Sequence, residues 1–178
     1  IINIKSYDDA IHANMDTALE NGNSPKGNVN ISGGIINVYS NDDGIHADGT
    51  LTINNGIVEV ENSYEGVEGS FIEIKGGNIS INSNDDGINS TATSGTGITI
   101  SGGVNYIYCK GDGIDSNSRT SYAGIHFSGG ATTIISNSNG NSSIDSEQGY
   151  KYTGGYVVAI MPSGGMSSEA THCANFSS

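Results

Sequence analysis

Residues 31–47, ISGGIINVYSNDDGIHA, contain a pattern that returns along the chain. The pattern combines a GG pair, a short apolar stretch and an acidic phrase that contains Gly. Its second acidic residue is Asp43, and Glu65 and Asp86 follow it at steps of 22 and 21 residues. Further copies are INNGIVEVENSYEGVEG (53–69), IKGGNISINSNDDGINS (74–90), ISGGVNYIYCKGDGIDS (100–116) and FSGGATTIISNSNGNSSIDS (127–146), with partial copies at 4–13 and 152–160. A repeat of this length predicts a solenoid.

Apolar residues alternate within each copy, as in Leu51–Ile53 and Ile79–Ile81, and most of the apolar residues are β-branched. This period of two predicts strands. The sequence therefore predicts an all-β fold, a right-handed parallel β-helix of about six or seven rungs that forms one domain over residues 1–178. The insertions at 14–28 and 91–97 should be loops. The period ends after Ile160, so we expect residues 161–178 to form a C-terminal cap or tail.

The composition is acidic and rich in glycine. The 178 residues carry a net charge of -13 and include 27 Gly. This charge argues against nucleic acid and anionic membranes as partners, and no apolar run is long enough to span a bilayer. No signal peptide is visible, so we expect a targeting segment outside these residues and a monomer that is secreted or on a bacterial cell surface. Cys109 and Cys173 allow one disulfide at most, and the sequence leaves their pairing open.

Stacked rungs place equivalent residues in columns, and three columns of this chain are polar. If Ile45 points inward, Asp42 and His46 lie at odd offsets and point outward, whereas Asp43 would enter the core of a straight strand. Gly44 is expected to break the frame, because glycine adopts backbone angles that other residues avoid. The first column contains Asp8, Asp42, Tyr64, Asp85, Gly111 and Asn141; the second contains Asp9, Asp43, Glu65, Asp86, Asp112 and Ser142; the third contains His12, His46, Glu68, Asn89, Asp115 and Asp145.

Carboxylates stacked in columns repel one another. Two like charges about 5 Å apart repel by about 3 kcal/mol at an effective dielectric near 20, so the columns need protonation or a bound cation. An environment of carboxylate, carbonyl and Asn oxygens suits Ca²⁺, which we expect as the cofactor. Two His and no Cys in the columns make zinc the weaker alternative. A metal-free alternative is that the Asp-Gly phrases are turns held by hydrogen bonds from side chain to backbone.

The phrases SNDDGIHADGTLTINNG, SYEGVEGSFIEIKGGNISINSNDDGIN and KGDGIDSN resemble the carbohydrate-binding β-helix family of clostridial and other surface proteins. The resemblance extends from about Ile2 to Ser168. It implies a fold similar to that of the calcium-dependent pectate lyases. It also implies a calcium-binding protein that binds polygalacturonate and cellulose without lyase activity.

The related lyases bind calcium through a D-D-G-x-D phrase and an Asp of a neighbouring rung. Carried over residue by residue, no copy here has all three carboxylates: His46 and Asn89 end two copies, and Tyr64 and Gly111 begin two others. The resemblance therefore implies ligands shared between rungs. The implied metal ligands are Asp9, Asp42, Asp43, Glu65, Glu68, Asp85, Asp86, Asp112 and Asp115.

The sequence leaves three functions open. A calcium-dependent lyase needs a base, and Lys110 is the best candidate among six Lys and Arg, although a solvated surface lysine is the simpler interpretation. A binding module needs calcium that bridges to acidic polysaccharide, with Arg119 and Lys110 as cationic contacts and Tyr64 as a stacking surface. A calcium-clamped structural spacer needs no ligand.

We favour the non-catalytic binding module and assign no catalytic residue. Other tyrosines near the acidic phrases are Tyr39, Tyr106, Tyr108 and Tyr122.

Overall fold

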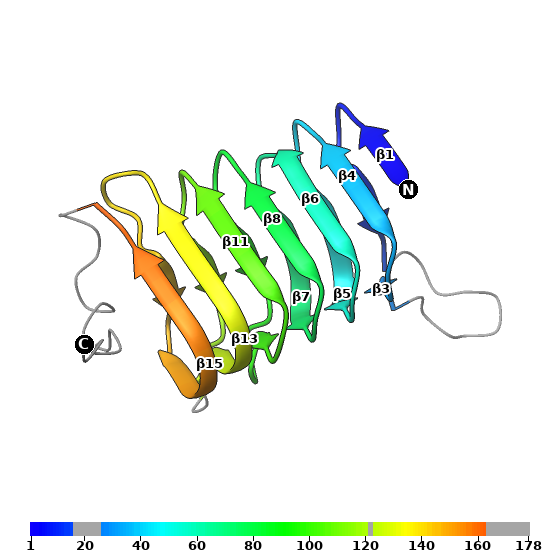
Figure 1. Cartoon of the computed structure of the whole chain (residues 1–178). Helices are drawn as coiled ribbons and strands as arrows, with labels where there is room; N and C mark the ends of the chain where they lie inside the picture. The colour runs from blue at the N-terminus through cyan, green and yellow to red at the C-terminus, as the bar shows by residue number, and fades with distance from the viewer. Residues whose placement is uncertain (16–25, 121–122, 163–178) are drawn as a thin grey trace.

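The computed structural model of the protein describes residues 1–15, 26–120 and 123–162. Within these ranges it contains strands but no helix, and so no helix that could cross a membrane. The strands coil around one axis, and the coils stack side by side from the N-terminal end to β15 (Figure 1). The chain runs up the front face and returns behind it while advancing toward the C-terminal end, which is a right-handed coil (Figure 1). The predicted all-β parallel β-helix is confirmed.

Three ladders of parallel strands form the walls of the solenoid. The first contains β1 (Ile2–Lys5), β4 (Ile35–Tyr39), β6 (Ile57–Asn62), β8 (Asn78–Asn82), β11 (Val104–Cys109) and the second parts of β13 (Ile125–Ser136) and β15 (Tyr150–Ile160). The second contains β2 (Ile11–Ala13), the first parts of β5 (Ile45–Ile53) and β7 (Val67–Ile74), β9 (Ile88–Ser90), β12 (Ile114–Ser116) and β14 (Ile144–Ser146). The third contains β3 (Val29–Ile31), the second parts of β5 and β7, β10 (Ile98–Ile100) and the first parts of β13 and β15.

One pass through the three ladders is one rung, so the strand pairing agrees with the predicted number of rungs. The predicted loop at 91–97 lies between β9 and β10. Most of the insertion at 14–28, and residues 163–178 of the predicted cap, lie outside the described residues.

Columns of aliphatic side chains fill the core. Ile45, on β5, is fully buried as predicted, and its column passes through every rung of the second ladder. Burying one such side chain stabilises the fold by about 1.5–3 kcal/mol, and the neighbouring rungs provide the surface against which it packs. The column consists of Ile11, Ile45, Val67, Ile88, Ile114 and Ile144.

Glycine occupies the acidic phrases for a reason other than the predicted one. Gly44 is not among the glycines with positive φ. A Cβ on Gly44 would lie 2.5 Å from the carbonyl oxygen of Gly66 and 2.8 Å from Cγ1 of Val60. The same crowding recurs at Gly66, Gly87 and Gly113. The expectation of an unusual backbone angle at Gly44 was therefore wrong, because this glycine column makes room for the next rung.

A buried column of small polar residues precedes the acidic phrases, and the sequence analysis did not identify it. The Ser40 hydroxyl donates to the carbonyl oxygen two residues later at 3.0 Å, and the Ser83 hydroxyl does the same at 3.2 Å. Cys109 occupies the same position, and its thiol donates to the carbonyl oxygen of Gly111 at 3.4 Å. Cys109 is a free buried thiol whose pKa burial raises to about 12, and Cys173 lies outside the described residues. The column consists of Ser40, Ser63, Ser83, Cys109 and Ser136.

We expect Cys109→Ser to change the free energy of unfolding by less than about 1 kcal/mol. Serine is the residue at this position on the neighbouring rungs, and its hydroxyl can make the hydrogen bond that the thiol makes now. Chemical denaturation of both proteins under reducing conditions measures the difference. A loss of several kcal/mol would show that the thiol packs in a way that serine cannot replace.

Candidate functional site

The three predicted polar columns exist in register. In the third column the strand pairs join His12 to His46, and His46 to Glu68, at the N-terminal end. The same column continues through Asn89 to Asp115 and Asp145. Backbone hydrogen bonds link the first and second columns in the predicted order, as in Tyr64 N–H to the Asp42 carbonyl oxygen at 2.8 Å. Carboxylates of successive rungs therefore do lie along one edge of the solenoid.

Second-column carboxylates also hold the backbone of the following rung. The Asp43 N–H donates to Asp9 Oδ1 at 3.0 Å, and the Asp112 N–H donates to Asp86 Oδ1 at 2.7 Å. The Ser142 N–H donates to Asp112 Oδ1 in the same way. These hydrogen bonds resemble the metal-free alternative, in which side chains hold the turns by bonding to the backbone. Here, however, each carboxylate accepts a backbone N–H of the next rung instead of one in its own turn. One oxygen of each of these carboxylates thus has a structural role.

Burial raises the pKa of several of these acids above the ordinary value for aspartate, so they stay protonated to a higher pH. Burial raises the pKa of Asp86 to about 7, and nearby carboxylates add to the effect. Burial, with the charges of Asp86, Asp145 and Asp112, raises the pKa of Asp115 to about 7. The pKa of Asp112 is also raised, mainly by burial. This part of the ladder can reduce its repulsion by binding protons.

Glu65 and Glu68 share an amide in the middle of the ladder. Asn89 Nδ2 donates to Glu65 Oε2 at 3.0 Å and to Glu68 Oε2 at 3.2 Å. Burial, followed by the hydrogen bond with Glu68, raises the pKa of Glu65 to about 9. Glu65 is therefore protonated at neutral pH, so a metal that uses it as a ligand must first displace a proton.

The N-terminal end of the ladder has a mixed set of donors. His12 and His46 stack with ring centroids 4.4 Å apart. His12 Nδ1 lies 2.7 Å from Asp9 Oδ2, and His46 Nδ1 lies 3.2 Å from Asp43 Oδ2. Burial, with the charges of Glu68 and Asp9, raises the pKa of Asp43 to about 6.

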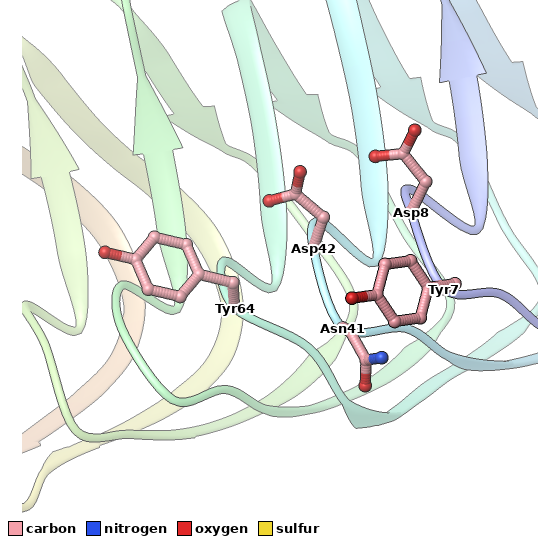
Figure 2. Close-up of a pocket in the computed structure, with 5 residues that line it drawn as sticks. All are labelled: Tyr7, Asp8, Asn41, Asp42 and Tyr64. Atoms are coloured by element: carbon pink, nitrogen blue, oxygen red, sulfur yellow. The ribbon is translucent and has the colours of Figure 1, made fainter.

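An open pocket lies beside this end, lined by two tyrosines and two aspartates. Asp8 and Asp42 project in the same direction from adjacent rungs, with Tyr7 on one side and Tyr64 on the other, and Asn41 completes the lining (Figure 2). Tyr7 is 89% exposed and Tyr64 is 50% exposed. Sequence reasoning proposed Tyr64 and placed Asp8 in the first column without naming it a metal ligand, and it missed Tyr7, although both Tyr7 and Asp8 belong to the opening copy YDDAIH.

Only some of the predicted ligands converge. Within the described ranges, three groups place three ligand atoms within 4.8 Å of one another: Asp8, Asp9 and Asp42; Asp9, His12 and His46; and Asp43, His46 and Glu68. The first group offers oxygen alone, which fits calcium. Desolvation, followed by the charges of Asp9 and Asp8, raises the pKa of Asp42. None of the three groups contains Glu65, Asp85, Asp86, Asp112 or Asp115.

A family model for carbohydrate-binding domain-containing proteins matches residues 48–178, which is most of the chain. The chain belongs to this carbohydrate-binding domain family. No curated protein and no solved structure matches it. Of the column residues, the match includes those from Tyr64 onward, whereas Asp8, Asp9, His12, Asp42, Asp43 and His46 precede it. Membership of the carbohydrate-binding domain family supports a polysaccharide partner and a binding role instead of a catalytic one.

The two cationic residues proposed as sugar contacts in this carbohydrate-binding domain protein lie away from the pocket. Lys110 Nζ donates to Asn84 Oδ1 at 2.8 Å. Arg119 is exposed, and its Nη2 lies 3.7 Å from Glu147 Oε1. Neither residue lines the pocket between Tyr7 and Tyr64. Of the other tyrosines, Tyr39, Tyr106 and Tyr108 lie on the first ladder, and Tyr122 lies outside the described residues.

Proposed function

We propose that this protein is a secreted or cell-surface binding module for acidic polysaccharide such as polygalacturonate, and that it binds through calcium. The observation that supports this proposal most directly is a pocket lined by Asp8 and Asp42 between two exposed tyrosines, where one oxygen of Asp9 lies within 4.8 Å of both aspartates. The family gives carbohydrate as the partner. Calcium is inferred from the carboxylates that converge here, and the acidity of the polymer from the resemblance to the β-helix family of surface proteins.

Binding of an anionic polymer at this acidic pocket requires a cation that bridges the two. A chain with a net charge of -13 repels polyuronate, and three converging carboxylates increase this repulsion locally. Bound calcium would supply positive charge and vacant coordination positions, since three carboxylates leave part of its 6–8 oxygen ligands unfilled. Asp8, Asp9 and Asp42 would hold the ion, and sugar oxygens would complete its coordination. The exposed faces of Tyr7 and Tyr64 would pack against the sugar rings.

Two observations favour this function over the alternatives. A lyase needs a base within reach of the substrate, and the described residues that line the pocket include no Lys, Arg or His. A structural spacer needs a metal site closed by protein, whereas Asp8 and Asp42 face an open pocket (Figure 2).

Calcium should raise the melting temperature of the protein above its value in EGTA. A ligand at about 100 times its Kd stabilises the folded state by about 2.7 kcal/mol, which corresponds to roughly 5–10 °C for a chain of this size. Asp42→Asn should remove most of this shift, because it takes one charge from the converging set. Asp85→Asn is the matched control, since Asp85 lies in the same column outside that set. Equal calcium shifts in all three proteins would refute the assignment.

Tyr64→Ala should weaken calcium-dependent binding of oligogalacturonate by about tenfold, because it removes one stacking surface. It should leave the calcium-induced melting shift unchanged, since Tyr64 supplies no ligand. Titration calorimetry in calcium and in EGTA separates the two effects, and ultraviolet absorbance monitors unsaturated product. Release of that product would indicate a lyase, and sugar binding of equal strength in EGTA would exclude the calcium bridge.

A further inference from the structure

Two imidazole rings and two carboxylates meet on adjacent rungs at the N-terminal end of the third column. The rings of His12 and His46 are nearly parallel, with 12° between their planes. Asp9 Oδ2 lies 2.7 Å from His12 Nδ1 and 3.7 Å from His46 Nδ1. Asp43 Oδ2 lies 3.2 Å from His46 Nδ1. Two nitrogens and two oxygens therefore gather at the Nδ1 edges of the rings.

The Nε2 edges of the same rings also face carboxylates. Asp48 Oδ1 lies 3.7 Å from His12 Nε2 and 3.4 Å from His46 Nε2, and Glu68 Oε1 lies 3.3 Å from His46 Nε2. Asp48 is held from its other side, because its Oδ2 accepts the Met15 N–H at 2.5 Å. A histidine that binds a metal usually donates its other ring N–H to a carboxylate. Asp48 and Glu68 occupy the place of that acceptor.

One ligand atom from each of Asp9, His12 and His46 lies within 4.8 Å of the others, which is close enough for one ion to contact all three. A cation at the Nδ1 edges would offset the negative charge of Asp9 and Asp43, whose carboxylates lie on adjacent rungs. It would leave Nε2 of His46 facing Glu68 and Asp48, whose oxygens lie 3.3 and 3.4 Å away.

We propose that His12, His46 and Asp9, with Asp43 beside them, bind a divalent transition-metal ion of the Zn²⁺ class. Imidazole nitrogen suits Zn²⁺, Co²⁺ and Ni²⁺, whereas Ca²⁺ takes oxygen ligands. Zinc was the weaker alternative from the sequence because the columns contain only two His. Folding places these two on adjacent rungs, face to face and bordered by carboxylates at both edges. This site goes beyond the proposed carbohydrate binding, and either could exist without the other.

Zn²⁺ titration of the wild-type chain tests the site directly. We expect the ring ¹⁵N signals of His12 and His46 to shift together and saturate at a single equivalent of Zn²⁺ in excess Ca²⁺. His126 should not respond, because its Nε2 lies 2.8 Å from Thr153 Oγ1 and away from the cluster. Shifts of neither ring, or loss of both shifts when Ca²⁺ is added, would overturn the proposal. This measurement needs no variant and no sugar.

Co²⁺, used as a coloured probe, provides a second measurement. His12→Gln and His46→Gln should each weaken Co²⁺ binding by at least about tenfold and change its visible absorption, whereas His126→Gln should do neither. Variants at Asp9 are avoided, because Asp9 also belongs to the oxygen-only group. Melting curves in chelator check that the variants are folded. Unchanged Co²⁺ affinity in both variants would show that the rings are not ligands, whatever the outcome for calcium and sugar.

Discussion

Gly87→Ala should lower the melting temperature by roughly 6–12 °C. A Cβ at this position would lie 2.3 Å from Cγ2 of Ile107 and 2.5 Å from the carbonyl oxygen of Gly113. Both atoms belong to the next rung, and Ile107 is fully buried, so neither can move without disturbing the stack. Overpacking of a close-packed core costs about 3 kcal/mol at the upper end of its usual range, and each kcal/mol shifts the melting temperature by roughly 2–4 °C in a chain of this size.

Gly69→Ala is the matched control for this prediction. Gly69 lies on β7, one rung before Gly87, yet a Cβ there would meet its nearest neighbours at 3.4 Å, which is ordinary contact. The preceding rung already has alanine at this position, since Ala47 pairs with Gly69. Gly69→Ala should therefore be neutral or slightly stabilising. Equal melting temperatures for the two variants would show that crowding does not explain the glycine column.

In EGTA the protein should lose stability as the pH rises from about 4 to about 7. Folding raises the pKa of both Asp86 and Asp115 from 3.8 to about 7. Between these values the folded state binds protons that the unfolded state has released, so stability is greatest at the acidic side of the window and falls through it. If about 1 kcal/mol per carboxylate remains after solvent screening, the melting temperature at pH 8 should be roughly 4–8 °C below that at pH 5.

The double variant Asp86→Asn, Asp115→Asn should reduce this pH dependence and melt above the wild type at pH 8, while Glu65 and Asp43, whose pKa values are also raised, maintain the remainder. Asparagine keeps the shape of the side chain, and its Oδ1 can still accept the Asp112 N–H that Asp86 accepts now. Glu59→Gln removes a charge from an exposed position on β6 and serves as the control. A wild type that melts at the same temperature at pH 5 and pH 8 would mean that the buried carboxylates do not carry this penalty.

The fold follows from the sequence because the repeat determines it. Once GG pairs and acidic phrases are aligned, the alignment itself predicts which residues stack, and the pairing of His46 with Glu68 and of Asn89 with Asp115 confirms it. The reason for Gly44 could not be obtained in this way. Its crowding arises from Val60 and Gly66 on the next rung, and a distance between rungs is not visible in one copy of a repeat.

The site was less predictable than the columns. Alignment gave the carboxylate ladder but not how close its members lie, which depends on the rotamers of individual side chains. Asp8 and Tyr7 belong to an incomplete first copy and were therefore undervalued, although both line the pocket. His12 and His46 were treated as departures from an acidic pattern. Their significance depends on Asp48, which contacts both rings from a position outside the three aligned columns.

The glycine column contacts only the adjacent rung, and this has a consequence for how the gene can change. Residues 57–77 form one complete coil, and Ile57 and Asn78 occupy equivalent positions above one another. Deleting the codons for this coil would join Gly56 to Asn78 and leave each surviving coil with a neighbour of the kind it had before. Duplicating them would lengthen the protein equally cleanly. This architecture thus tolerates the deletion or duplication of a whole coil. A single base change that replaces a glycine of the column is tolerated less well.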